Sequence, residues 1–195
     1  MNNLKILETI QLPTRHGPFV MSIISVDDGL EHVVLEHIAD VEQSKPPLVR
    51  IHSECMTGDI FGSHRCDCGE QLEKSLDIIG ASDHGFVFYL RQEGRGIGLL
   101  NKMKSYNLQE QGYDTIEANH MLGFDTDLRD YKMVADYLKT RGIDHVTLIT
   151  NNPEKCVALS SDDIKVDRQP MPTTTHHENK KYKDTKVKKM GHFGH

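Results

Sequence analysis

The chain has 195 residues, is 37% hydrophobic and 27% charged, and carries a formal net charge of −6 at pH 7, which suits one globular domain with a substantial core. Its acidity excludes the broad positive surface that nucleic acids require, and no stretch approaches the roughly 18 apolar residues of a membrane helix. Because the first residues also lack the basic-then-apolar order of a secretory signal, we expect a cytoplasmic domain without nucleic-acid or membrane partners.

Predicted strands and helices alternate along most of the chain. They cover a hairpin of two strands at residues 20–25 and 31–38, a strand at 48–52, a helix at 70–79, a strand at 85–90, helices at about 99–111 and 131–140, a strand at 145–150, and a helix from near Glu154. The strands are short apolar runs bounded by turn residues, whereas the helices repeat apolar residues every three or four positions. Asn152 and Pro153 suit the start of the last helix, and Gly142 suits the end of the helix before it.

From Leu48 onward strands alternate with helices, so the predicted fold class is α/β. We expect one layered domain over residues 1–195, with a mixed β-sheet flanked by helices. Residues 167–179 hold prolines, threonines and histidines and predict an exposed, irregular loop. The lysine-rich stretch from Asn179 to the end has two open interpretations, a solvated helical face or a basic flap beside an anionic ligand.

Three of the four cysteines lie close together in the sequence, and their spacing indicates a metal site. Cys55, Cys66 and Cys68 follow the pattern C-x10-C-x-C. In a cytosolic chain such a cluster favours metal binding over disulfides. Three thiolates with one open position are typical of a catalytic zinc, which lowers the pKa of bound water to about 7.

Other interpretations of the cysteine cluster stay open. A structural zinc would take a fourth ligand from His52, His64 or Cys156, and the cysteines could also simply pack in the core. The acids Glu54 and Asp67 either orient the metal ligands or are exposed. Base deaminases use a similar zinc, but their full H-x-E…P-C-x-x-C signature is absent from this sequence.

A glycine-rich turn, with Gly94, Gly96 and Gly98, follows one predicted strand and precedes a helix. Glycines let backbone N–H groups approach a ligand, and the start of a helix favours an anion. Arg91 and Arg95 add forked donors for a phosphate or a carboxylate. The spacing matches neither G-x-G-x-x-G nor a P-loop, so an ordinary structural turn is the alternative.

Acidic residues near these turns are candidates for ligand contacts. The carboxylate of Glu93 can accept from the two adjacent donors on the edge of a guanine base, whereas an ordinary surface glutamate is the alternative. Asp125, Asp127 and Asp130 surround Arg129 in a predicted loop. Helix capping and solvated ion pairs also explain such a cluster.

Four segments carry a resemblance to a known family: RIHSECMTGDIFGSHRCDCGEQL, RQEGRGIGLLNKMKSYNLQEQGYDTIEANHMLGFDTDLRDY, TNNPEK and the terminal TKVKKMGH. Through them the chain resembles GTP cyclohydrolase II over nearly its whole length, least evidently over residues 156–178. The resemblance implies zinc-dependent hydrolysis of GTP, which opens the imidazole ring and releases formate and diphosphate. The product would be 2,5-diamino-6-ribosylamino-4(3H)-pyrimidinone 5′-phosphate, and the reaction would be the first step of riboflavin synthesis.

The resemblance also implies roles for residues at matching positions. Cys55, Cys66 and Cys68 would hold one zinc per subunit, and Mg²⁺ would accompany the nucleotide phosphates. The contacts with GTP would be Arg50, Ile51, His52, Ser53, Glu54, Gln71, Glu93, Gly94, Arg95, Thr115, Thr150 and Lys155. Asp127 would be the proton acceptor, and Arg129 the nucleophile or, on equal physical grounds, an electrostatic stabiliser. Tyr106 would serve the ring opening, and the family implies a homodimer.

Overall fold

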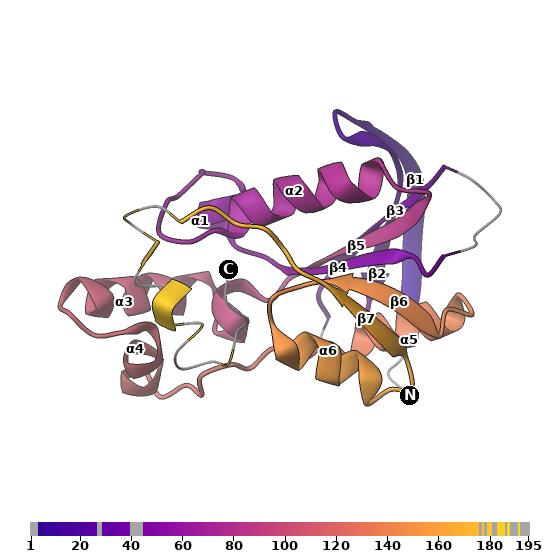
Figure 1. Cartoon of the computed structure of the whole chain (residues 1–195). Helices are drawn as coiled ribbons and strands as arrows, with labels where there is room; N and C mark the ends of the chain where they lie inside the picture. Colours follow the sequence, from indigo (N-terminus) through magenta and orange to yellow (C-terminus); the bar gives the residue numbers. More distant parts are fainter. Residues whose placement is uncertain are drawn as a thin grey trace.

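The computed structural model describes residues 4–26, 29–39 and 45–175, together with residues 177, 179, 180, 183–185, 187 and 191. The elements in chain order are β1 (Lys5–Thr14), β2 (Gly17–Ser25), β3 (His32–Ile38), β4 (Leu48–Ser53), α1 (Met56–Asp59), α2 (Cys68–Gly80), β5 (His84–Leu90), the short 3₁₀ helix η1 (Glu93–Gly96), α3 (Gly98–Glu110), α4 (Thr115–Met121), α5 (Lys132–Thr140), β6 (His145–Ile149), α6 (Pro153–Ser160) and β7 (Lys165–Gln169) (Figure 1). None of these helices is both long and apolar enough to cross a bilayer.

The strands form one seven-stranded sheet in the order β1-β2-β3-β5-β4-β6-β7. The pairs β1–β2, β2–β3 and β3–β5 are antiparallel. The pairs β5–β4, β4–β6 and β6–β7 are parallel. The predicted α/β class, with a mixed sheet flanked by helices, is therefore confirmed. The parallel half matters most for function, because it brings the carboxyl ends of four strands to one edge of the sheet.

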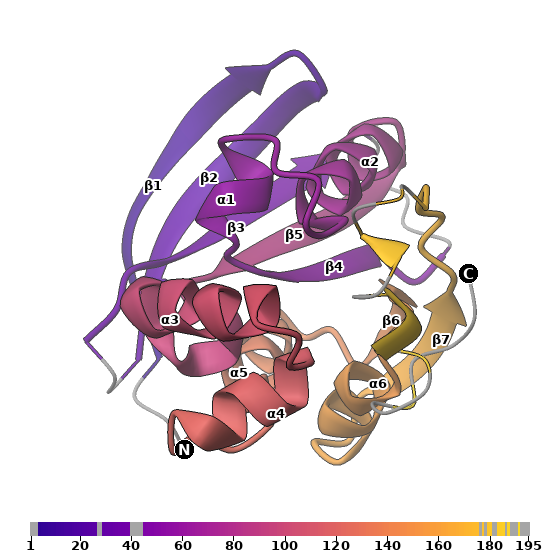
Figure 2. The ribbon, with the colours of Figure 1, turned by 90° about the vertical axis from the view of Figure 1, so that its left-hand side faces the viewer.

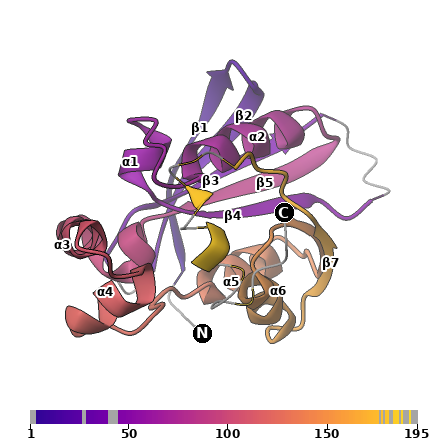
Figure 3. The same cartoon turned by 60° about the vertical axis from the view of Figure 1, so that its left-hand side comes forward.

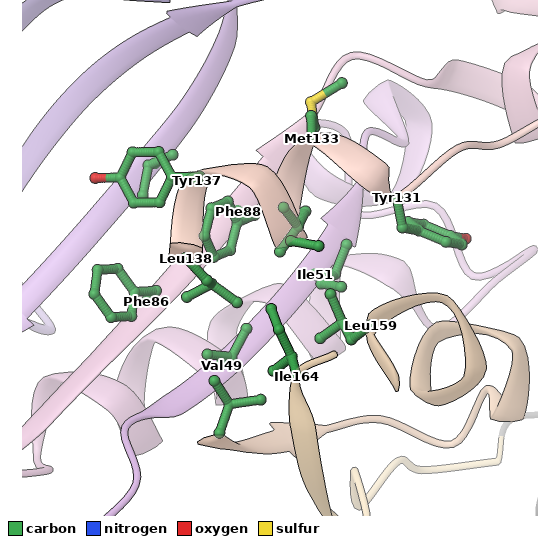
Figure 4. Close-up of a cluster of buried hydrophobic side chains, with 14 of the residues drawn as sticks. Val49, Ile51, Phe86, Phe88, Tyr131, Met133, Tyr137, Leu138, Leu159 and Ile164 are labelled. Carbon is green, nitrogen blue, oxygen red and sulfur yellow. The ribbon is translucent and has the colours of Figure 1, made fainter. Parts of the chain in front are cut away.

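Alternating side chains on the parallel strands divide the core between two faces of the sheet. On one face Phe86 and Phe88 of β5 pack against α5, where Tyr137 lies edge-on to both rings at centroid distances of 6.2 and 5.4 Å (Figure 4). On the other face Val87 packs with Ile79 of α2. This period of two is the ordinary consequence of strand geometry. It also decides which residues of β4 reach the site described below.

The predicted elements are present, but β1, α1, η1, α4 and β7 were not predicted. β1 is an edge strand whose residues are mostly exposed, so it lacks the apolar alternation that marks a strand. α4 begins with a capping box in which Asp114 accepts from the backbone of Glu117 and the Glu117 side chain accepts from the backbone of Asp114. That D-x-x-E pattern was a readable signal for a helix start. Between the two strands of the predicted hairpin, Asp27 and Asp28 lie outside the described residues.

The loop expected over residues 167–179 is wrong at its start, because Lys165–Gln169 forms β7 in parallel register with β6. This strand is held through its backbone and its residues are mostly polar, which explains why composition indicated a loop. The chain after β7 is also anchored: Asn151 donates to the Met171 carbonyl (2.7 Å) and accepts from the Met171 backbone N–H (3.0 Å). Residues 176 and 178 lie outside the described part of the chain.

The lysine-rich end of the chain is described at only some positions. Lys183 is buried, and its Nζ donates to Thr175 Oγ1 (2.8 Å) and Thr173 Oγ1 (3.0 Å). Lys183 therefore fastens the segment that follows β7 and is not part of a solvated face. Lys181, Lys186, Lys188 and Lys189 lie outside the described residues.

Candidate active site

A pocket opens at the carboxyl ends of the parallel strands. Its lining includes residues at or just after the ends of β4, β5 and β6, together with residues of α2, α3 and α4. In Figures 2 and 3, α1 and α2 lie on one side of β4 and α3 and α4 on the other. In α/β sheets this edge is where ligands ordinarily bind, because loops from several strands meet there. The fold thus joins segments that are about a hundred residues apart in the sequence.

The pocket brings together all the predicted site residues except two. Those that line it are Arg50, His52, Ser53, Glu54, Cys55, Cys66, Cys68, Gln71, Glu93, Gly94, Arg95, Tyr106, Thr115, Arg129, Thr150 and Lys155. Ile51 does not reach it: the side chain is 1% exposed and packs in the core on the opposite face of β4. Asp127 is the other exception, and it contacts the pocket residue Arg129.

The three clustered cysteines converge around one point. The sulfur atoms of Cys55, Cys66 and Cys68 all lie within 4.8 Å of one another, and no other His, Cys, Asp or Glu of the described residues joins this group. The cysteines are not in disulfides. Cys156 packs against the core, so it is not positioned as a fourth ligand. Three soft sulfur donors without a fourth side chain fit a zinc ion with an open coordination position.

Two glycines allow this convergence. A Cβ added to Gly69 would lie 2.4 Å from the Gly58 carbonyl oxygen, so α1 and the start of α2 approach as closely as glycine permits. A Cβ on Gly58 would lie 2.9 Å from Cys66 Sγ and 3.3 Å from Cys55 Sγ. Any side chain at Gly58 would therefore intrude on the sulfurs themselves.

We expect Gly58→Ala to disturb the cysteine cluster while the rest of the fold persists. Overpacking of this kind costs about 1–3 kcal/mol, because the neighbouring atoms must shift. Zinc content measured by elemental analysis should fall below that of the parent chain. Gly123→Ala is the matched control: Gly123 has a φ of +81° and nothing within 4 Å of its added Cβ, so this change adds backbone strain without touching the sulfurs. Equal zinc content in both variants would contradict the expectation.

The cysteines do not share one protonation behaviour. Hydrogen bonds from the Cys66 and Cys68 thiols, together with the nearby Lys102 ammonium, lower the pKa of Cys55 well below its ordinary value. The pKa of Cys66 is raised to about 11, mainly because its thiol is the donor to Cys55. Among the three thiols, Cys55 is therefore the one that loses its proton most readily.

Lys102 is a site residue that sequence reasoning missed. It projects from α3, is 7% exposed, and donates to Cys55 Sγ (3.1 Å) and Glu93 Oε1 (2.8 Å). Burial lowers the pKa of Lys102, but the Cys55 thiolate and Glu93 outweigh burial and raise the pKa above its ordinary value. The available signal was its position four residues before Tyr106, which places both on one face of the helix.

Asp59 is a second residue that the sequence did not single out. Its carboxylate accepts from the Cys55 backbone N–H (2.9 Å), from the Tyr89 hydroxyl (3.0 Å) and from His52 Nε2 (3.0 Å). Burial lowers the pKa of His52, which favours a neutral ring that donates to this carboxylate. Asp59 thus orders the turn that carries Cys55, and its hydrogen bond with Nε2 fixes the orientation of the His52 ring.

Glu93 is not the ordinary surface glutamate of the alternative interpretation, since it is only 9% exposed. It accepts from the Met56 backbone N–H (2.7 Å), from the Gly94 backbone N–H (2.9 Å) and from Lys102 (2.8 Å). The turn that follows it needs a left-handed backbone, with φ of 62° at Gly94 and 63° at Arg95. A non-glycine residue in that region is uncommon and often marks a functional turn.

Buried cations gather at another part of the pocket. Arg50 is held between Gln71 Oε1 (2.6 Å) and the Ile149 carbonyl (3.1 Å), and burial lowers its pKa to about 10. Gln71 in turn donates to the buried Asp67, which is therefore not an exposed acid. Lys155 donates to the Ile51 carbonyl (2.8 Å). Fixed cations of this kind suit an anionic ligand with several charges.

Arg129 is held by Asp127 in a two-pronged contact. Arg129 Nε donates to Asp127 Oδ1 (2.8 Å), and Arg129 Nη2 donates to Asp127 Oδ2 (2.5 Å). Burial raises the pKa of Asp127, but the hydrogen bonds and charge of Arg129 outweigh it and lower the pKa below the ordinary value. The pair is therefore ionised at neutral pH, and Asp127 fixes the direction of the guanidinium.

The chain is similar to known proteins over most of its length. A sequence model of the family GTP cyclohydrolase II matches residues 5–170. Riboflavin biosynthesis protein RibBA from Bacillus cereus (strain B4264) and that from Bacillus subtilis (strain 168) are each 50% identical to it, over 94% and 95% of this chain and 47% of each relative. The chain thus spans about half the length of these curated relatives. A structure described as RibBX, a two-domain 3,4-dihydroxy-2-butanone 4-phosphate synthase from A. baumannii, matches 75% of this chain and 34% of its own length, at 13% identity and a TM-score of 0.43.

Proposed function

Because this chain belongs to the GTP cyclohydrolase II family, we propose that it hydrolyses GTP, opening the imidazole ring and releasing formate and diphosphate. The remaining product would be 2,5-diamino-6-ribosylamino-4(3H)-pyrimidinone 5′-phosphate, which would enter riboflavin synthesis. The observation that carries the proposal is the single pocket in which three converging cysteines and several buried cations lie together. One part suits a thiophilic metal, and the other suits a triphosphate.

We propose that Cys55, Cys66 and Cys68 hold one zinc ion per subunit. Their donor set and the space kept clear by Gly58 fit this metal. When bound, zinc supplies activated water at neutral pH, which is the chemistry that hydrolytic opening of a purine ring requires. The cluster supports this assignment without a fourth protein ligand among the described residues.

The remaining pocket residues would bind and orient the nucleotide. Arg50, Arg129 and Lys155 would contact the phosphates, and Mg²⁺ would accompany the phosphates because hard cations prefer oxygen ligands. Glu93 would accept from the guanine edge, for which its carboxylate would exchange one of its present donors. The other proposed GTP contacts are His52, Ser53, Glu54, Gln71, Gly94, Arg95, Thr115 and Thr150, with Ile51 limited to its backbone.

Three residues would act near the reacting atoms. Arg129 would stabilise charge on the α-phosphoryl group or attack it, and the contact with Asp127 favours stabilisation, because an arginine paired with a carboxylate stays protonated. Asp127 would serve as the proton acceptor only after that pair opens. Tyr106 would serve the ring opening; burial raises its pKa to about 12, so it would act as a neutral hydroxyl.

The direct test is to incubate the purified chain with GTP, Zn²⁺ and Mg²⁺ and to identify the products by mass spectrometry. Formate, diphosphate and the pyrimidinone are expected, whereas ATP, which lacks the guanine donors, should give no formate. Ammonia without formate would point to a deaminase, and metal binding without turnover would point to a binding module. Light scattering and cell fractionation would test the further proposals of a homodimer and a cytoplasmic location.

A further inference from the structure

Lys102 is a buried ammonium whose hydrogen bonds are all made inside the protein. Its Nζ donates to Cys55 Sγ (3.1 Å), Thr57 Oγ1 (3.0 Å) and Glu93 Oε1 (2.8 Å). An ammonium group has three N–H donors, and here each has one acceptor. Lysine is almost never buried unless it is paired, and Lys102 is only 7% exposed. The charge is therefore fixed in position and direction, beside one sulfur of the cysteine cluster.

The charge balance of the cluster explains why a cation would be placed there. Three thiolates around a divalent ion leave one excess negative charge, and the Glu93 carboxylate adds another close by. In a buried site, uncompensated charge of one sign is costly. A cation that donates to a sulfur also draws electron density from it, and such contacts to metal ligands tune the metal that they hold.

We propose that Lys102 is a positioning residue of the metal centre, which fixes the Cys55 thiolate by hydrogen bonding and offsets the excess negative charge of the three sulfurs. The inference rests on the proposed function, since it presumes a metal on these cysteines. It also assigns Lys102 a second contact, because the same ammonium holds Glu93, the carboxylate proposed to meet the guanine edge. One side chain then ties the metal part of the pocket to the part proposed for the base.

Cobalt substitution tests this role through the sulfurs rather than through turnover. The full chain is loaded with Co²⁺, and the absorption band for charge transfer from thiolate to cobalt is measured. Removal of a charged donor raises the energy of the sulfur electrons, so Lys102→Met should move the band to longer wavelength. Lys102→Arg retains a charged donor and should stay near the parent position. Lys104→Met is the matched control, because Lys104 lies on the exposed side of the same helix.

The outcomes separate this inference from the function on which it rests. An unchanged band in Lys102→Met overturns the proposed role of Lys102, and so does an equal shift in Lys104→Met. A parent chain that gives no cobalt–thiolate band at all overturns the metal centre and with it the proposed function. If Lys102→Met does not fold, Lys102→Gln supplies the same loss of charge with a polar end. In the zinc-loaded chain we expect formate release by a folded Lys102→Met or Lys102→Gln variant to fall about 10- to 100-fold.

Discussion

Replacement of Cys66 with serine is expected to remove zinc and reduce formate release to background, while the fold survives. A serine hydroxyl stays protonated at neutral pH and is a poor ligand for zinc, so two thiolates would remain where three converge. Cys66 Sγ lies 3.6 Å from Cys55 Sγ, and Cys66 is not part of either hydrophobic cluster of the core. The loss should therefore be one of chemistry more than of stability. Metal analysis of the sample measures the loss of zinc, formate detection measures the loss of activity, and thermal unfolding measures whether the fold survives.

Cys156→Ser provides the matched control, since it makes the same chemical change at the fourth cysteine. Cys156 packs beside the core on α6, away from the cluster. It should retain both zinc and formate release. A Cys156 variant that loses zinc would revive the structural-zinc interpretation, and a Cys66 variant that still produces formate would contradict the catalytic one.

Much of the site was predictable because it lies where strands end. Strand prediction placed the ends of β4, β5 and β6 close to Ser53, Leu90 and Ile149, and parallel strands bring such ends together. The spacing of the cysteines then indicated a metal, and the resemblance supplied the roles. Ile51 shows the limit of transfer by position, because alternation along β4 turns its side chain into the core.

The site residues that were not predicted act through contacts that leave no repeating pattern in the sequence. Lys102 and Asp59 are single charged residues whose partners lie far away in the chain or across a tight turn. Only the fold shows that Lys102 and the side chain of Asp59 are buried. β1 and β7 escaped for a related reason. Both are the outermost strands of the sheet and are held by backbone pairing with mostly exposed side chains, so neither carries the alternating apolar signal.

The second large effect is expected at Arg129, where substitution by lysine should reduce diphosphate release about 100- to 1,000-fold. Arg129 presents its guanidinium to the pocket while Nε and Nη2 are fixed by the two oxygens of Asp127. Lysine retains the charge but has neither the planar fork nor the length to keep both contacts, so the charge would no longer be held in one direction. Diphosphate is measured after mixing with GTP, and zinc content should stay unchanged. Arg15→Lys, at an exposed arginine, is the control.

The same pair offers a way to separate the two roles open to Arg129. Because the pKa of Asp127 is lowered, the carboxylate stays ionised through the neutral range, and its hold on Arg129 is lost only as the pH falls through that lowered pKa. A stabilising Arg129 therefore needs the ionised pair, and diphosphate release should be flat with pH until that acidic limb, which Asp127→Asn should remove along with most of the rate. A nucleophilic Arg129 must instead lose a proton, so its rate should rise steeply with pH, and intact-protein mass spectrometry after mixing with GTP should detect a guanylyl adduct. A flat profile without an adduct would leave stabilisation as the role of Arg129.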